Sequence, residues 1–375
     1  MNNGKFISAL AVLVGTAVGA GYLGMPYVVS KSGFIPGVIM LIFVAFFMLV
    51  IYLYLGEISL RTKGNHQLTG YSEKYLGKTG KWLMFLSMIF GIYSALAAYL
   101  LAEGQSISFA FFGNESYGLL FSLLFWLLMA GLTYIGLKAL KKYDKIALFL
   151  VIIVIILITV FFSGTIDVKN LSYSNPKYFF VPFGVILFSF LAFSAMPEVE
   201  RVLTGEERYM KKVIVYGMAI PFVIYLLFML VMVGNFGIKV PEIATLALGR
   251  FFSVLGVLTM FTAFFTLTLA IRDMFRFDFN LGRLRGWLLA VFVPLILFLL
   301  TYFANIATFV QILSISGIVS GGLAGILILV MNLKAKKTGN RKPEYSIPIN
   351  WWIISIMSAI FIGAVIAEFL LKAKI

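Results

Sequence analysis

The chain has 375 residues, of which 62% are hydrophobic and only 12% are charged. A soluble domain of this composition lacks the polar side chains to cover its surface, so the sequence predicts a polytopic membrane protein. There is no cysteine, and the single His66 lies in a charged loop. Disulfides, metal sites and the usual constellations of enzymes are therefore not expected.

Eleven apolar segments follow one another along the chain. They lie at about 6–30, 33–56, 82–112, 117–137, 146–163, 178–196, 213–235, 244–271, 286–303, 306–332 and 350–371. Continuous apolar runs of this length predict transmembrane helices, because lipid requires every backbone polar group to be satisfied within the segment. The loops are short throughout, so residues 1–375 are predicted to form a single transmembrane domain.

The net charge of +15 is distributed unevenly between the two faces of the membrane. With a cytoplasmic N-terminus, 23 of the 30 Lys and Arg residues lie on the cytoplasmic face and seven on the other. The positive-inside rule therefore predicts a multi-pass plasma-membrane protein with its N-terminus in the cytoplasm and its C-terminus outside. The lipid bilayer explains the positive charge, and nucleic acid is not expected as a partner.

The first segment contains the string GTAVGAGYLGMP at residues 15–26. Gly19 to Gly24 satisfies the dinucleotide pattern G-x-G-x-x-G, but no strand precedes it, so that interpretation is excluded. Gly15 and Gly19 satisfy the helix-packing pattern G-x-x-x-G, which leaves both a monomer and a homodimer open. A third interpretation is a helix broken near the membrane midplane by Gly19 and Gly21, with Pro26 discouraging its continuation.

Broken helices in secondary transporters occur in pairs, at matching places in two inverted repeats. Five segments later, the sixth segment contains Pro182, Gly184, Ser189, Ser194 and Pro197. We therefore expect an all-α membrane protein of eleven helices in which helices 1 and 6 are broken. Repeat one covers about 6–163, repeat two about 178–332, and an additional helix about 350–371.

The string at 15–26, together with MPEVER at 196–201, resembles the amino acid/auxin permease family. That family belongs to the amino acid/polyamine/organocation superfamily, which has the leucine-transporter fold. The stretch TAFFTLTLAIRD at 262–273 is similar to the eighth span of the bacterial hydroxy and aromatic amino acid permeases. The resemblance implies a secondary active transporter for amino acids that uses no cofactor other than a coupling ion, H⁺ or Na⁺.

A broken first helix presents free N–H groups where its second half begins and free carbonyls where its first half ends. These groups suit the carboxylate and the ammonium group of a neutral amino acid, and small neighbouring residues leave room for an aromatic or branched side chain. The expected substrate-binding residues are Thr16, Ala17, Gly19, Ala20, Gly21, Ser189, Phe190, Ala192, Phe193, Ser194 and Tyr99.

The resemblance also implies a sodium site between the carbonyls of Gly15 and Val18 and hydroxyls of the eighth segment. Thr259, Thr262 and Thr266 share one helix face there. Ala263 stands where many sodium-coupled relatives have serine, and threonines in helices often bond only to the preceding turn, so protons are favoured over sodium. The candidate proton carrier is Glu103, which has no basic residue near it in sequence.

Four charged residues near the cytoplasmic ends of the segments are expected to form ion pairs that close a cytoplasmic gate. They are Glu57, Glu198, Arg201 and Asp273. The alternative function is a sensor or germination-receptor-like subunit on the same fold, which binds an amino acid without moving it.

Overall fold

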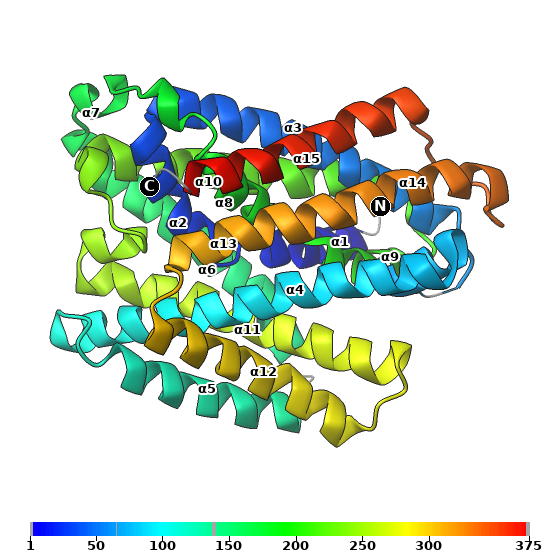
Figure 1. Cartoon of the computed structure of the whole chain (residues 1–375), viewed down its shortest axis with the longest axis horizontal. Helices are drawn as coiled ribbons and strands as arrows, with labels where there is room; N and C mark the ends of the chain where they lie inside the picture. Colours follow the sequence, from blue (N-terminus) through cyan, green and yellow to red (C-terminus); the bar gives the residue numbers. More distant parts are fainter. Residues whose placement is uncertain (1–2, 65, 137–139, 373–375) are drawn as a thin grey trace.

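The computed structural model describes residues 3–64, 66–136 and 140–372, and this part of the chain is almost entirely helical (Figure 1). Its only β-type pairing within these residues is an isolated bridge between Gly33 and Ser174. The long helices run side by side, and their connections gather at the two ends of the bundle. We call the end that carries residues 61–64, 203–209, 279–282 and 339–350 the basic end.

The α-helices are α1 (Asn3–Ala17), α2 (Gly21–Ser32), α3 (Phe34–Leu60), α4 (Leu68–Phe112), α5 (Gly118–Ile135), α6 (Leu140–Phe162), α7 (Val168–Ser172), α8 (Pro182–Ser189), α9 (Met196–Val202), α10 (Met210–Phe236), α11 (Arg250–Asp278), α12 (Arg283–Ala304), α13 (Phe309–Ser316), α14 (Gly322–Thr338) and α15 (Trp351–Lys372). A π-helical turn, Gly317–Gly321, joins α13 to α14.

Each of the eleven predicted segments overlaps a helix of the structure. Within the described residues, eight helices are long and apolar enough to cross a membrane, or nine if the bent pair α1–α2 is one span. Two further apolar helices, Ile152–Thr165 and Trp351–Ala367, are shorter. The chain is therefore a multi-pass, all-helical membrane protein.

The helices differ strongly in how deeply they are buried. In the stretch Pro182–Val202, 83% of the most apolar window is buried, against 22% in Arg283–Ala304. Figure 1 accordingly shows α8 near the centre of the bundle and α12 at its lower edge. The most buried of the spans compared is therefore one of the two that the sequence predicts to be broken.

Helix α4 is longer than expected, because its first fourteen residues, 68–81, precede the predicted apolar segment, and the first nine of these form an amphipathic stretch. Gly77, with φ +74°, separates this amphipathic stretch from the long span. Tyr71 and Tyr75 bury their rings while Glu73 and Lys74 stay exposed. A search for continuous apolar runs misses such a stretch, since only one of its faces is apolar.

Proline plays a different part in the two broken helices. Pro182 and Pro197 stand in the first turns of α8 and α9, where the missing N–H group costs nothing. Pro26, in contrast, lies inside α2, which continues to Ser32. The expectation that Pro26 discourages continuation of the helix was wrong, and the glycines before it mark the break.

Candidate functional site

Two interruptions of helical structure lie close together inside the bundle. Helix α1 ends at Ala17 and α2 begins at Gly21, with a bend of 51° between them. Helix α8 ends at Ser189, and α9 begins only at Met196. A Cβ atom at Gly21 would lie 2.8 Å from the Cα of Ser189, so the two breaks approach each other backbone to backbone.

Three buried tyrosines hydrogen-bond to the broken backbone. The hydroxyl of Tyr225 lies 2.8 Å from the carbonyl oxygen of Ala17 and 2.7 Å from that of Ser189, and donates to them. Tyr52 donates to the carbonyl of Phe190 at 2.9 Å and accepts from the N–H of Ala192. These bonds satisfy backbone groups that lipid would leave unpaired.

The third tyrosine is Tyr99, whose hydroxyl accepts from the N–H of Ala20 at 3.3 Å. Sequence reasoning singled out Tyr99 but missed Tyr52 and Tyr225. The sequence signal for Tyr52 and Tyr225 was weak, since each contributes a single hydroxyl group within a long apolar segment. Only the fold reveals that α3 and α10 pass directly beside the breaks.

Several backbone groups at the first break have no partner within the described residues. These are the carbonyls of Gly15 and Thr16 at the end of α1, and the N–H groups of Gly21 and Tyr22 at the start of α2. The carbonyls form the negative end of one helix dipole, and the N–H groups form the positive end of another. The break can therefore bind a group of each sign at one place.

A small cavity of about 70 Å³ lies between the two breaks. Its lining residues are Gly15, Thr16, Ala17, Gly19, Gly21, Met88, Gly91, Ile92, Ala95, Tyr99, Phe188, Ser189, Leu191, Phe193, Ser194, Ala263, Thr266, Leu267 and Ser320. None of them carries a charge, so its polar groups are backbone atoms and hydroxyls.

A larger cavity of about 720 Å³ continues from the small one towards the basic end. The two share Gly15, Thr16, Ser194 and Thr266. The larger cavity is lined farther along by residues such as His66, which stands in a connection at that end. The two cavities are thus adjacent, and the larger one extends from the breaks to the basic end.

Most of the predicted substrate-binding residues line the small cavity. They are Thr16, Ala17, Gly19, Gly21, Ser189, Phe193, Ser194 and Tyr99. Ala20, Phe190 and Ala192 do not line it, and all three are fully buried. The backbone groups of these three bond to Tyr99 and Tyr52 instead, because consecutive residues of a broken helix point in different directions.

Gly15 and Gly19 differ in their surroundings. A Cβ atom at Gly15 would meet no described atom within 4 Å, so that position faces open space. At Gly19 the added carbon would lie 2.7 Å from the hydroxyl of Tyr99. In the described structure Gly15 therefore borders open space, whereas Gly19 allows the close approach of Tyr99 from α4.

The residues of the predicted sodium site are only partly brought together. Val18, Thr262 and Thr266 line the larger cavity beside Gly15. Thr259 bonds to the carbonyl of Gly256 and to the hydroxyl of Tyr22, while Thr262 donates to the carbonyl of Thr259 at 3.0 Å. Of the three threonines, Thr266 is the one whose hydroxyl has no hydrogen-bond partner in the described part of the chain.

Glu103 is fully buried one helical turn beyond Tyr99 in α4. Neither of its carboxylate oxygens has a hydrogen-bond partner within the described residues. Burying an ionised carboxylate without a partner costs several kcal/mol, so this environment disfavours the charged form. Glu103 lines none of the cavities described above.

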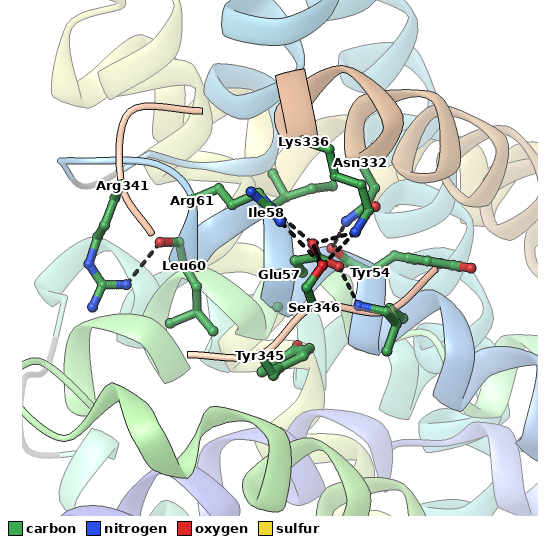
Figure 2. Close-up of polar contacts among 12 residues, drawn as sticks. Tyr54, Glu57, Ile58, Leu60, Arg61, Asn332, Lys336, Arg341, Tyr345 and Ser346 are labelled. Atoms are coloured by element: carbon green, nitrogen blue, oxygen red, sulfur yellow. Dashed lines mark hydrogen bonds and ion pairs between the residues drawn. The ribbon is translucent and has the colours of Figure 1, made fainter. Parts of the chain in front are cut away.

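Glu57 forms a buried cluster of ion pairs and hydrogen bonds near the basic end (Figure 2). Its carboxylate lies 2.9 Å from Nε of Arg61 and 2.8 Å from Nζ of Lys336. It also accepts from Oγ of Ser346 at 2.7 Å and from the backbone N–H of Ile347 at 3.1 Å. The charge of Glu57 is therefore fully compensated.

This cluster holds the stretch 339–350 against α3. Tyr345 donates to the carbonyl of Leu53 at 2.7 Å, and Tyr54 donates to that of Pro348 at 2.8 Å. Burial and the nearby Glu57 carboxylate raise the pKa of Tyr345 well above its ordinary value, so its hydroxyl stays protonated as a donor. Glu57 thus joins α3, α14 and the connection to α15.

The other three gate candidates lie apart from Glu57. Glu198, Arg201 and Asp273 line the larger cavity, from α9 and from α11. Arg201 pairs with Glu198 at 2.6 Å, and Asp273 pairs with its neighbour Arg272 at 2.8 Å. Among the described residues, no group of three His, Cys, Asp or Glu side chains could hold a metal ion.

Comparison with known proteins agrees with this architecture. Residues 2–247 match the tryptophan/tyrosine permease family. The low affinity tryptophan permease of Proteus vulgaris is 26% identical over 240 residues, which cover 60% of this chain and 56% of the relative. Tyrosine-specific transport system 2 of Haemophilus influenzae is 26% identical over 238 residues, which cover 61% and 58%.

A third relative is glutamine transporter 2 of Aliivibrio fischeri, which is 23% identical over 241 residues, or 62% of each chain. The chain thus spans less than two thirds of the length of these three relatives. All three are named for the transport of an amino acid, and none for catalysis. Because the family match covers residues 2–247, the chain belongs to the tryptophan/tyrosine permease family.

Proposed function

We propose that this protein is a secondary active transporter that imports neutral amino acids by alternating access. The observation that carries the proposal is the meeting of two broken helices at an uncharged cavity. Carbonyl and N–H groups without a partner among the described residues flank the first break, at Gly15, Thr16, Gly21 and Tyr22. The relatives named for tryptophan, tyrosine and glutamine transport support it.

The backbone of the first break would recognise the two charges of the amino acid. The carboxylate would bind at the N–H groups that begin α2, and the ammonium group at the carbonyls of Gly15 and Thr16. The hydroxyls of Ser194 and Thr266 face both cavities and have no hydrogen-bond partner within the described residues. Met88, Ile92 and the other apolar lining residues suit an aromatic or branched side chain.

The membrane topology is part of the proposal. Eleven spans, arranged as two inverted repeats of five with helix α15 added, agree with two breaks five spans apart. The fold proposed for the chain is the leucine-transporter fold of the amino acid/polyamine/organocation superfamily. With the basic end in the cytoplasm, the 720 Å³ cavity opens inward.

Protons are the favoured coupling ion. Thr259 and Thr262 donate their hydroxyl protons to backbone carbonyls, and Ala263 beside them supplies no side-chain oxygen, which supports a site poorly suited to sodium. Glu103 is the candidate proton carrier, since its buried carboxyl has no partner among the described residues. Its place one turn from Tyr99 would let its protonation influence the break at Ala20.

The test is uptake of radiolabelled tryptophan, tyrosine and glutamine by proteoliposomes that contain the purified protein. Accumulation driven by an inward proton gradient without sodium would establish a proton-coupled permease. Accumulation only with a sodium gradient would overturn proton coupling. Saturable binding to folded protein without uptake under either gradient would favour the sensor-like alternative.

A further inference from the structure

Tyr225 is the point where the two broken helices are bonded to the same side chain. Its hydroxyl, on α10, reaches the last residue of α1 and the last residue of α8, at 2.8 and 2.7 Å. The ring is fully buried and packs edge to face on Phe190 at 5.2 Å. Tyr225 lines neither the small nor the larger cavity, so it acts through the backbone it holds.

A phenolic hydroxyl has one proton, so the two carbonyls compete for it. Ala17 has a second donor, the N–H of Gly19 at 2.9 Å. For Ser189, Tyr225 is the donor that the described residues supply to its carbonyl. Loss of the hydroxyl would therefore leave the carbonyl of Ser189 buried and unpaired.

Ser189 also packs directly against Gly21, where the second half of the first broken helix begins. Its backbone contacts Gly21 so closely that a Cβ atom there would lie within 3.0 Å of it. A displacement of Ser189 would be transmitted directly to the start of α2. One hydroxyl thus connects the end of α1, the end of α8 and, through Ser189, the start of α2.

We propose that Tyr225 is a positioning residue that makes α1 and α8 move as one unit during transport. The proposal rests on the transport function proposed above. Tyr225 contacts the half-helices and not the cavity, so its hydroxyl would govern the rate of the conformational change more than the affinity for the amino acid. The chemistry required is a single neutral hydrogen-bond donor shared by two backbone acceptors.

The test compares Tyr225→Phe with Tyr93→Phe. Tyr93 makes the same kind of bond, from α4 to the carbonyl of Leu289 at 3.1 Å, and lines neither cavity. The chain has no native cysteine, so spin labels can be attached at Ile7→Cys in α1 and Phe180→Cys just before α8. Both positions are exposed. Pulsed electron paramagnetic resonance then gives the distance distribution between the two half-helices.

Tyr225→Phe is expected to broaden that distribution and to lower the maximal rate of tryptophan uptake about tenfold, as expected for one buried carbonyl left unpaired. KM should change less than about threefold, and Tyr93→Phe should change neither quantity. An unchanged distance distribution in Tyr225→Phe, or equal losses in both variants, would overturn the proposal. If the unmutated protein transports none of the tested amino acids, the proposed function fails, while the distances still decide the role of Tyr225.

Discussion

Gly21 and Gly15 provide a matched pair of substitutions within one glycine-rich string. A Cβ atom at Gly21 would lie 2.8 Å from the Cα of Ser189 and 2.9 Å from its Cβ. At Gly15 the same atom would meet nothing within 4 Å. Changing each glycine to alanine therefore adds one methyl group to a filled site in the first case and to an open one in the second.

The expected magnitudes follow from these contacts. At Gly21 the obstacle is backbone, so α2 must shift relative to α8, and overpacking of this kind lowers the free energy of unfolding by about 1–3 kcal/mol. At Gly15 alanine relieves the entropic disadvantage of glycine in a helix, which raises that free energy by about 0.5–1 kcal/mol. The methyl group at Gly15 would still project into the cavity.

The assay measures the free energy of unfolding in mixed micelles with increasing dodecyl sulfate, and tryptophan uptake in proteoliposomes. Gly21→Ala should lose both stability and uptake. Gly15→Ala should gain a little stability while its KM for uptake rises. Equal unfolding free energies for the two variants would refute the close approach of the two breaks.

Three further outcomes are expected. Glu57→Gln should lower the free energy of unfolding by about 3 kcal/mol, because Arg61 and Lys336 lose a buried partner. The control is Glu344→Gln, in a half-exposed pair with Arg341, which should change that free energy by less than about 1 kcal/mol. Glu103→Gln should abolish amino acid accumulation driven by a proton gradient. It should not lower the free energy of unfolding, since neither carboxylate oxygen has a partner in the described structure. Unchanged accumulation would exclude Glu103 as the proton carrier. Val202→Cys, in the cavity at the basic end, should react with an impermeant maleimide only from the cytoplasmic side, and the reverse result would contradict the proposed orientation.

The spans and the first break could be predicted because their signals are local. Long apolar runs can only form helices in lipid. Two glycines close together, such as Gly19 and Gly21, weaken a helix whatever surrounds it. The amphipathic stretch 68–76 was missed because its tyrosines are buried by neighbours distant in sequence. Likewise, nothing in the residues around Pro26 reveals that α2 continues past it.

By itself, the sequence determined that this is a helical membrane protein with interruptions in its first and sixth apolar segments. Hydrophobicity and glycine content act over a few residues, so they can be read along the chain. Only the tertiary structure decided that both breaks meet at one cavity, that Tyr225 bonds to both, and that Glu57 joins α3 to α14 and not to the other charged candidates. Those contacts join residues up to about 280 positions apart, and only the packing of the helices sets their distances.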